Sequence, residues 1–519
     1  MGMVAPQQRI ASAFFVFCGG YGDVSRYARE RGVCRQWVYR EAAWLRDFLT
    51  GAQQELQRLR VEVQELKQQQ LHLKQQLALS VVIDEEMQAR LASVGQARGV
   101  TLRDCRELLE VLIPGKVLSV ATLGRRTQAA GKKAGKLLAV LDEFARERVR
   151  EAAADEIYVK DPVLMVVEPE SLCWSSGQLS DTVSGQAWQE QFEQLPNLEQ
   201  VTRDGGSGLE KGLALVNAAR EQKDQAPVVD QGDHFHALWG GGVGLRKAEL
   251  RAAKTLAEAE AAQKELAECQ HQGQKQTGPA ARARHAWQKA ERAMDSWQER
   301  ERLWQQTKEA LRLFTPTGEL NTRPQVEAAL AETLSQLPDV DFAKVKRQLQ
   351  KPEMLNYLDR VQQKIAALPF PEEAKQAAVR QEGLRRRPEA LQGKSPQAAA
   401  LRGILLMCAV VLSKTDAAGQ AVAAVKDIFR RAYRASSLVE CINSVLRMHQ
   451  AGHRRMTQGL LDLKRLYWNC HRFTSGRRRK TTPYERLGLL LPEGLHWWDL
   501  LKLTPEQLKE KLSTAKMAA

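Results

Sequence analysis

The sequence predicts a multidomain protein that joins all-helical regions to one mixed α/β core. Three observations support this fold class. The chain has 519 residues, whereas single hydrophobic cores stop growing at about 250–300 residues. Short apolar runs with the period of β-strands are confined to residues 155–230. The stretches on either side are rich in Ala, Glu, Gln, Lys and Arg, which favours helices.

Composition limits the classes of protein. The 77 basic residues exceed the 62 acidic residues by 15, which favours a polyanionic partner, although a basic surface also fits a ribosome- or membrane-associated protein. The eight cysteines are scattered without a Cys-x-x-Cys pair, so we expect no zinc finger and a reducing compartment. The longest apolar run, 403–412, is shorter than the ~20 residues that span a bilayer. We expect a soluble, cytoplasmic protein with no membrane partner.

Residues 1–48 predict a small helical domain in which Gly32 separates two helical segments. Two helices joined by a short glycine-bearing turn form a helix-turn-helix candidate, and Arg35, Gln36 and Arg40 of the second helix would face DNA. The residues of that helix expected mostly inside are Trp37, Val38 and Trp44. An ordinary helical pair is the alternative.

Residues 49–80 are glutamine-rich and repeat with a period of seven. Position a of the heptad holds Leu49, Leu56, Val63, Gln70 and Leu77, and position d holds Leu59, Leu66 and Leu73. Such a repeat predicts a coiled coil, and a polar Gln70 at a buried position would fix its register. The partner is either a second protomer, which we favour, or another helix of the same chain.

Residues 81–148 predict a second helical region. Thr101 can cap one of its helices, and Lys132, Lys133 and Lys136 begin another. The basic residues suit a second DNA-binding unit. A solvated charged turn is the alternative.

Residues 149–244 change period and predict the first part of an α/β core. The expected elements are strands at 155–159, 162–168 and 171–178, a helix at 181–195, a strand ending at Asp204, a helix at 209–219 and a strand at 227–229. Trp188 and Phe192 would face inward from the first helix. Residues 245–430 predict an all-α insertion, and residues 431–519 predict the second part of the core and a helical tail.

Three acids in separate segments are the candidate catalytic residues. Asp155 begins an apolar strand, Asp204 ends a strand before a glycine-rich turn, and Glu440 lies on a late helix. Singly, an Asp before glycine is usually a turn residue and a Glu on a helix is usually solvated. Together, two acids at strand ends and one on a helix can converge on a pair of Mg²⁺ ions, which prefer hard oxygen ligands.

Around these acids the chain resembles the DDE/DDD transposases, which belong to the RNase H-like recombinases. The segments that carry the resemblance are Asp155-Glu156-Ile157-Tyr158-Val159, Thr202-Arg203-Asp204-Gly205-Gly206-Ser207-Gly208 and Val439-Glu440-Cys441-Ile442-Asn443-Ser444-Val445-Leu446-Arg447, the last similar to a V-E-x-x-N-x-x-x-R helix. Tyr467-Trp468-Asn469 and Thr482-Pro483-Tyr484-Glu485-Arg486-Leu487-Gly488 resemble elements that often close such domains. The resemblance covers about 150–240 and 431–490. It implies an RNase H-like mixed sheet interrupted by a helical insertion, as in hAT-type transposases.

The resemblance implies a DNA transposase that cleaves transposon ends and transfers a strand into target DNA. Asp155, Asp204 and Glu440 would hold two Mg²⁺ ions, for which Mn²⁺ can substitute, with Asp155 bridging the two. The expected partners are double-stranded DNA, at the transposon ends and the target, and further protomers in a homodimer or higher oligomer. The expected location is the cytoplasmic nucleoid.

Further residues are expected around this site. Asn443 and Arg447 share a helical face with Glu440 and would meet phosphate. The basic run that follows is a candidate DNA contact and consists of Arg477, Arg478, Arg479 and Lys480. Asp233 and His236 follow the last strand and would form a secondary wall of the active site. Asp230 and Asp233 are also alternatives to Glu440 as the third acid. Four tryptophans of the insertion, Trp239, Trp287, Trp297 and Trp304, are expected to pack in the core, with stacking on an unpaired base as the alternative.

Two other functions fit the same residues. A structure-specific nuclease or resolvase would use the same core to cut DNA without joining it. A catalytically inactive DNA-binding regulator would keep the helix-turn-helix and the coiled coil on a decayed core, but the presence of all three acids speaks against this alternative.

Overall fold

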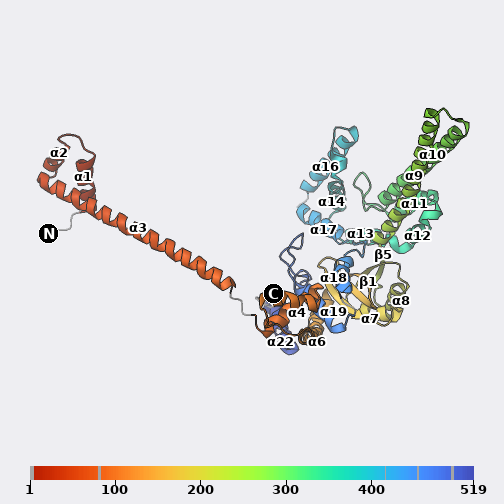
Figure 1. Cartoon of the computed structure of the whole chain (residues 1–519), viewed down its shortest axis with the longest axis horizontal. Coiled ribbons are helices and arrows are strands. Elements are labelled where there is room, and N and C mark those ends of the chain that lie inside the picture. Colours follow the sequence, from red (N-terminus) through yellow and green to blue (C-terminus); the bar gives the residue numbers. More distant parts are fainter. Residues whose placement is uncertain (1–4, 80–82, 415–416, 453–454, 492–495, 519) are drawn as a thin grey trace. The chain divides into compact units, whose positions relative to one another are not determined.

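The computed structural model describes residues 5–79, 83–414, 417–452, 455–491 and 496–518. The chain divides into two compact units, 1–84 and 85–519. It is mostly helical and contains one small mixed sheet of five strands (Figure 1). This architecture confirms the expected combination of helical regions with an α/β region.

The first unit contains three helices, α1 (Pro6–Phe17), α2 (Asp23–Glu30) and α3 (Arg35–Leu79). Gly32 adopts a positive φ of 65° between α2 and α3, a conformation that glycine reaches without steric cost. Tyr27 and Val38 are buried where the three helices meet. Trp44, which was expected inside, is instead 46% exposed. It lies beneath the guanidinium of Arg9, 3.4 Å from the ring centroid, so a cation–π contact covers one of its faces.

Helix α3 runs without interruption across the boundary expected at residue 48. The second helix of the helix-turn-helix candidate and the heptad segment are therefore one continuous helix of 45 residues. The side chain of Leu77 lies outside the described residues, as do residues 80–82 of the expected coiled coil.

The sheet of the second unit is built from β1 (Glu151–Val159), β2 (Asp161–Glu168), β3 (Cys173–Leu179), β4 (Gln200–Arg203) and β5 (Val229–Gly232). Their order across the sheet is β3-β2-β1-β4-β5. The pairs β1–β2 and β2–β3 are antiparallel, whereas β1–β4 and β4–β5 are parallel. The strands β2, β3 and β4 fall where the sequence predicts them, whereas β1 begins four residues before Asp155 and β5 covers 229–232 rather than 227–229.

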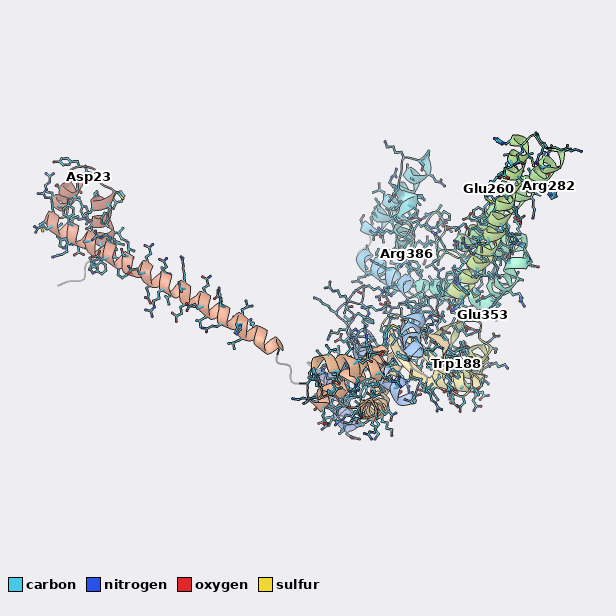
Figure 2. The ribbon with its side chains drawn as sticks, viewed as in Figure 1. Asp23, Trp188, Glu260, Arg282, Glu353 and Arg386 are labelled. Carbon is cyan, nitrogen blue, oxygen red and sulfur yellow. The ribbon has the colours of Figure 1, made fainter. Side chains whose placement is uncertain are left out.

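Helices cover both faces of the sheet. On one face α7 (Gly185–Glu193) and α8 (Ser207–Glu221) form a core with the even-numbered residues of β1, and Trp188 and Phe192 are buried there as predicted. Trp188 is labelled in Figure 2. On the other face α18 (Val439–Gly452) and α19 (Gln458–Cys470) pack against the odd-numbered residues of β1. Alternation of side chains along a strand thus assigns each residue of β1 to one of the two layers.

The helices before the sheet share a core with the end of the chain. These helices are α4 (Glu85–Arg98), α5 (Leu102–Leu112), α6 (Val120–Ala145) and the short η1 (Arg146–Arg148), and the C-terminal helices are α20 (Pro483–Arg486), α21 (Trp497–Leu500) and α22 (Pro505–Ala518). Apolar residues of α6, α19, α21 and α22 form one cluster. Arg465 of α19 also pairs with Asp142 of α6 in a buried site. The expected region 81–148 is therefore joined to the last segment of the chain by a common core.

The helical insertion begins directly after β5. Its elements are α9 (His234–His271), α10 (Thr277–Ala310), α11 (Arg323–Gln336), α12 (Asp339–Leu349), η2 (Pro352–Leu355), α13 (Asn356–Ala366), α14 (Glu372–Arg385), α15 (Pro388–Leu391), α16 (Pro396–Ser413) and α17 (Ala418–Arg430). They surround a core of their own (Figure 1). Among the described residues, α16 alone is long and apolar enough to cross a membrane by length and composition, and 22% of that stretch is buried against the insertion.

Candidate active site

Three acids lie in one row across the parallel half of the sheet. The pairing of β1 with β4 ends at Ala154 opposite Arg203, so the next residues, Asp155 and Asp204, are neighbours. The pairing of β4 with β5 ends at Arg203 opposite Gly232, which places Asp233 beside Asp204. The row therefore stands at the carboxyl ends of β4 and β5, where residues from separate segments meet.

Asp155 lies inside β1 rather than at the start of a strand as expected. Its Oδ1 accepts a hydrogen bond of 2.9 Å from the backbone N–H of Glu156, and its Oδ2 accepts one of 2.9 Å from Nδ2 of Asn443. Burial raises the pKa of Asp155 to about 6, and the nearby carboxylate of Asp204 adds to this effect, whereas the hydrogen bond from Asn443 opposes it.

Helix α18 brings the late acid to the same region. Asn443 contacts Asp155 directly, and Glu440 lies one turn earlier on the helix. Glu440 also raises the pKa of Asp155, which shows that its charge acts on the strand-borne acid. Its own carboxylate pairs with Arg447, 2.7 Å away. Asn443 and Arg447, expected to meet phosphate, are thus both hydrogen-bonded to acids of the candidate site.

The two alternative third acids have other contacts. Asp230 pairs with the buried guanidinium of Arg203, 2.5 Å away. Asp233 is 1% exposed, caps the start of α9 and accepts a hydrogen bond of 2.5 Å from the hydroxyl of Ser436. Both are engaged by these buried groups, whereas Glu440 pairs with the exposed Arg447 and lies one helical turn from Asn443, which contacts Asp155. The arrangement therefore favours Glu440 as the third acid.

Glu156 is a fourth carboxylate that the sequence analysis missed. Burial raises its pKa to about 7, and repulsion from Asp204 and Asp155 contributes to the shift. Its Oε2 is buried and has no hydrogen-bond partner among the described residues. Strand alternation is the signal that could have identified it, because residue 156 must face the layer of α8, whose first turn follows Asp204.

Asp233 and His236 form a hydrogen-bonded pair. Nδ1 of His236 faces Oδ2 of Asp233, and this contact raises the pKa of the imidazole. With Nδ1 bound in this way, Nε2 remains for another partner. His236 lines the same cavity as Asp204, so it stands on the wall of the candidate site. His234 is different, since it is buried, bonds to the carbonyl of Met354 and has a pKa lowered to about 4 by burial.

A cavity of about 840 Å³ extends from Asp204 along helices α9 and α12. Its basic lining residues are Lys247, Lys344, Arg347 and Lys351. Trp239 also lines it and is 65% exposed. The expectation that Trp239 packs in the core is therefore wrong, whereas Trp304 is buried as predicted. A basic channel with an exposed indole ring provides both phosphate contacts and a stacking surface.

The glycines in this region have different structural roles. A Cβ on Gly205 would meet nothing within 4 Å, so space is open beside Asp204. A Cβ on Gly208 would lie 1.9 Å from the carbonyl oxygen of Val183, so this glycine permits close packing of α8 on the loop between β3 and α7. A Cβ on Gly241 would lie 2.0 Å from the ring of Trp304, which requires glycine where α9 crosses α10.

The basic run of residues 477–480 lies away from the acidic row. Arg478 donates hydrogen bonds of 3.0 Å to the carbonyls of Glu170 and Pro169, and Arg477 is 3.8 Å from the Glu170 carboxylate. Glu170 follows β2, whose end is paired with the beginning of β1. This end of the strands is opposite the end that carries Asp155 and Asp204, and each end is called an edge of the sheet below. Arg479 and Lys480 are exposed there. Arg35, Gln36 and Arg40 are exposed at the start of α3 in the first unit.

The donor set around Asp155 suits a hard cation, although the side chains are not gathered around one point. Within the part of the chain that the structure describes, no group of three Asp, Glu, His or Cys side chains is close enough to hold a metal ion. Oxygen donors nevertheless converge here with raised pKa values, and one buried oxygen of Glu156 has no partner in that same part of the chain. Mg²⁺ suits such carboxylates because it keeps several waters and needs few protein ligands.

Comparison with protein-family models, with curated proteins and with solved structures found no match for this chain.

Proposed function

We propose that the second unit is the catalytic core of a DNA transposase, with an RNase H-like sheet and Mg²⁺-dependent phosphodiester chemistry. The order of elements along the chain, three strands, a helix, a strand, a helix and a strand, is the order that this resemblance implies. The mixed directions of the strands and the helices on both faces support it further.

One observation carries the proposal. Asp155, Asp204 and Glu440 come from segments up to 285 residues apart in the sequence. The register of β1 with β4 sets Asp204 next to Asp155, and the hydrogen bond from Asn443 to Asp155 brings the helix that carries Glu440 to the same place. Beside it runs a cavity with four basic residues. Acids for a metal ion next to cations for phosphate are the combination that cleavage of a phosphodiester needs.

In this proposal the residues of the candidate site have separate roles. Asp155, Asp204 and Glu440 would hold the divalent cations, which supply an activated nucleophile and stabilise the leaving oxygen. Asn443 orients Asp155 through its hydrogen bond. His236, held by Asp233, presents Nε2 to the substrate and can donate a hydrogen bond to a phosphate oxygen. Lys344 and Arg347 neutralise the backbone of the bound strand, and Trp239 stacks on an unpaired base.

The test uses the full chain and labelled duplexes from the DNA that flanks its coding sequence. Wild-type protein with Mg²⁺ should nick these duplexes and join the 3′ end to a target plasmid. Asp155→Asn, Asp204→Asn and Glu440→Gln should each lower the cleavage rate by roughly 10³-fold or more, because each removes a ligand that stabilises charge in the transition state. Gel-shift binding should remain close to wild type.

The exposed Asp181→Asn is the matched control and should cleave normally. Normal cleavage by any of the three variants would remove that residue from the catalytic set. Cleavage without joining would favour the structure-specific nuclease or resolvase. Binding without Mg²⁺-dependent nicking would favour the inactive regulator.

A further inference from the structure

Beyond its first heptads, helix α3 presents an apolar stripe that nothing in its own unit covers. The side chains of Leu49, Leu56, Leu59, Val63, Leu66 and Leu73 are each between 47% and 57% exposed. Figure 2 shows the side chains of this helix as sticks along the ribbon. Within the described residues of the first unit, α3 is accompanied by α1 and α2 alone, and both pack near its beginning.

The stripe has the composition of a two-stranded seam. Leucine occupies position d at Leu59, Leu66 and Leu73, and the β-branched Val63 occupies one position a, a combination that favours two strands. Gln70 is the one polar residue among the described a positions of the stripe. A single polar residue there disfavours shifted registers, since a shift would leave its amide buried against leucine.

The charged residues at positions e and g, which flank the stripe, favour a parallel orientation of two paired helices. Position g carries Glu55, Glu62 and Gln69, and position e carries Arg60, Lys67 and Lys74. In a parallel pair each g residue faces the e residue five places later on the other helix, so Glu55 meets Arg60 and Glu62 meets Lys67 of a second copy. In an antiparallel pair g faces g and e faces e, so glutamates would face glutamates and cations would face cations.

We propose that α3 pairs with a second copy of this chain in a parallel, in-register, two-stranded coiled coil. The inference goes beyond the transposase proposal and does not depend on it, because a catalytically inert chain would pair in the same way. The complementarity of e and g with the same sequence identifies the partner as another copy.

The position of α1 defines where the seam begins. Val38 and Ala42 occupy the d and a positions of the same register, yet both are fully buried within the first unit. Arg9 of α1 pairs with Glu41 on this face, 3.1 Å away. The face that forms the seam after Leu49 is therefore occupied by the chain's own α1 before it. Two copies of the α1–α2 region would stand at the same end of the dimer, related by a two-fold axis.

This symmetry determines how the candidate DNA-facing residues of the two copies are arranged. The exposed Arg35, Gln36 and Arg40 would occur twice, in opposite senses about the axis. A two-fold dimer of helix-turn-helix units matches two half-sites in inverted orientation.

Disulfide cross-linking tests the orientation. In a full chain with the exposed cysteines Cys18, Cys34 and Cys441 changed to Ser, Leu59→Cys and Leu73→Cys are introduced singly and mildly oxidised. A parallel, in-register pair places each d residue opposite itself, so both variants should form a covalent dimer. In an antiparallel pair at most one of the two positions lies opposite itself. Val61→Cys, at the outward position f, is the control and should stay uncrosslinked.

A charge reversal tests the partner. Glu55→Lys with Glu62→Lys sets like charges against Arg60 and Lys67, so the dimer affinity measured by sedimentation should fall roughly 100-fold. Adding Arg60→Glu and Lys67→Glu to that chain should restore it. The control, Asp47→Lys with Glu65→Lys, changes the net charge equally on the outer face and should leave the affinity unchanged. A wild-type chain that sediments as a monomer or trimer, or cross-linking at only one of residues 59 and 73, overturns the proposal.

Discussion

Both edges of the small sheet, meaning the two ends of its strands, carry several acids. The negative charges at the two edges are balanced by cations to different extents. At the edge where β1 begins, Glu151 is paired with Arg360 and Lys364, at 2.9 and 3.1 Å. Glu170 is paired with Arg430 and Arg486, at 2.6 and 2.9 Å. At the opposite edge Asp155, Glu156 and Asp204 repel one another, and burial with this repulsion raises the pKa values of Asp155 and Glu156.

Glu151 and Glu170 are held by ion pairs, whereas Asp155 and Asp204 are acids that we propose to hold divalent cations. Burial alone would raise the pKa of Glu170, but the hydroxyl of Tyr433 and the surrounding arginines reverse this, and its pKa is lowered overall. Around Asp155 the hydrogen bond from Asn443 and the charge of His236 offset the effect of burial only in part, so its pKa stays raised, and the causes that shift the pKa of Glu156 all raise it. Uncompensated carboxylates in a partly buried site are a feature of functional centres.

The largest expected effect on stability belongs to the balanced edge. Glu170→Gln leaves Arg486 without its carboxylate partner and leaves Arg430 with Asp427 alone, so the free energy of unfolding should fall by roughly 2 kcal/mol. Urea denaturation at pH 7 measures the change. Glu193→Gln, on the exposed side of α7, is the matched control and should change stability by less than about 0.5 kcal/mol. A neutral effect of Glu170→Gln would remove the distinction between the two edges.

A divalent cation should stabilise the unbalanced edge. At a Mg²⁺ concentration tenfold above the dissociation constant, binding to the folded state adds about 1.4 kcal/mol. Thermal denaturation at pH 8 with and without Mg²⁺ measures this. Asp204→Asn should lose the response, whereas Glu170→Gln should keep it because its acid lies at the other edge. An equal response in both variants would indicate non-specific binding.

Removal of one repelling charge should also stabilise this edge. The pKa of Glu156 is raised in the folded state from 4.5 to about 7, so the wild type loses stability as pH rises through this range. Glu156→Gln lacks this loss and should be more stable at pH 8 by on the order of 1 kcal/mol, allowing for solvent screening. Near pH 4 the difference should vanish. Denaturation in the presence of EDTA checks the trend, and a difference independent of pH would contradict it.

The basic residues can be compared in the same way. Lys344→Ala with Arg347→Ala, in the cavity beside Asp204, should reduce the slope of log affinity against log salt by about 1.8 if both meet phosphates of duplex DNA. Arg477→Ala with Arg478→Ala should change the slope less, because these residues already contact Glu170 and Pro169. Fluorescence anisotropy at several salt concentrations distinguishes the two pairs. A larger change for the second pair would place the DNA path at the other edge.

The sequence predicts the strands and helices of the core well, because burial dictates their apolar runs. Val163 to Val167 are all buried between two helical layers, which is why the run that contains them is continuous. The meeting of Asp155 with Asp204 follows from the parallel register, which a single sequence specifies only through the resemblance. Glu156 was missed because its importance comes from the opposite face of the same strand.

Other residues were predicted in the wrong place because the sequence alone does not show the path of the chain. Residues 477–480 follow α18 in sequence, but α19 is about 20 Å long and carries the chain away from the acids before they appear. Trp239 has the helical spacing of a core residue, and only the packing of α9 against α12 decides that its ring faces the cavity. Such choices between faces depend on tertiary contacts rather than on local period.

The continuity of α3 has a mechanical consequence. In an unbroken helix the number of residues fixes both the distance and the relative rotation of the two ends. Each added residue turns one end by 100° relative to the other and lengthens the helix by 1.5 Å. Two residues inserted between Arg40 and Leu49 would swing the basic face about 200° around the helix, whereas seven would return it to within about 20°. Natural length variation in this segment should therefore occur in steps of seven.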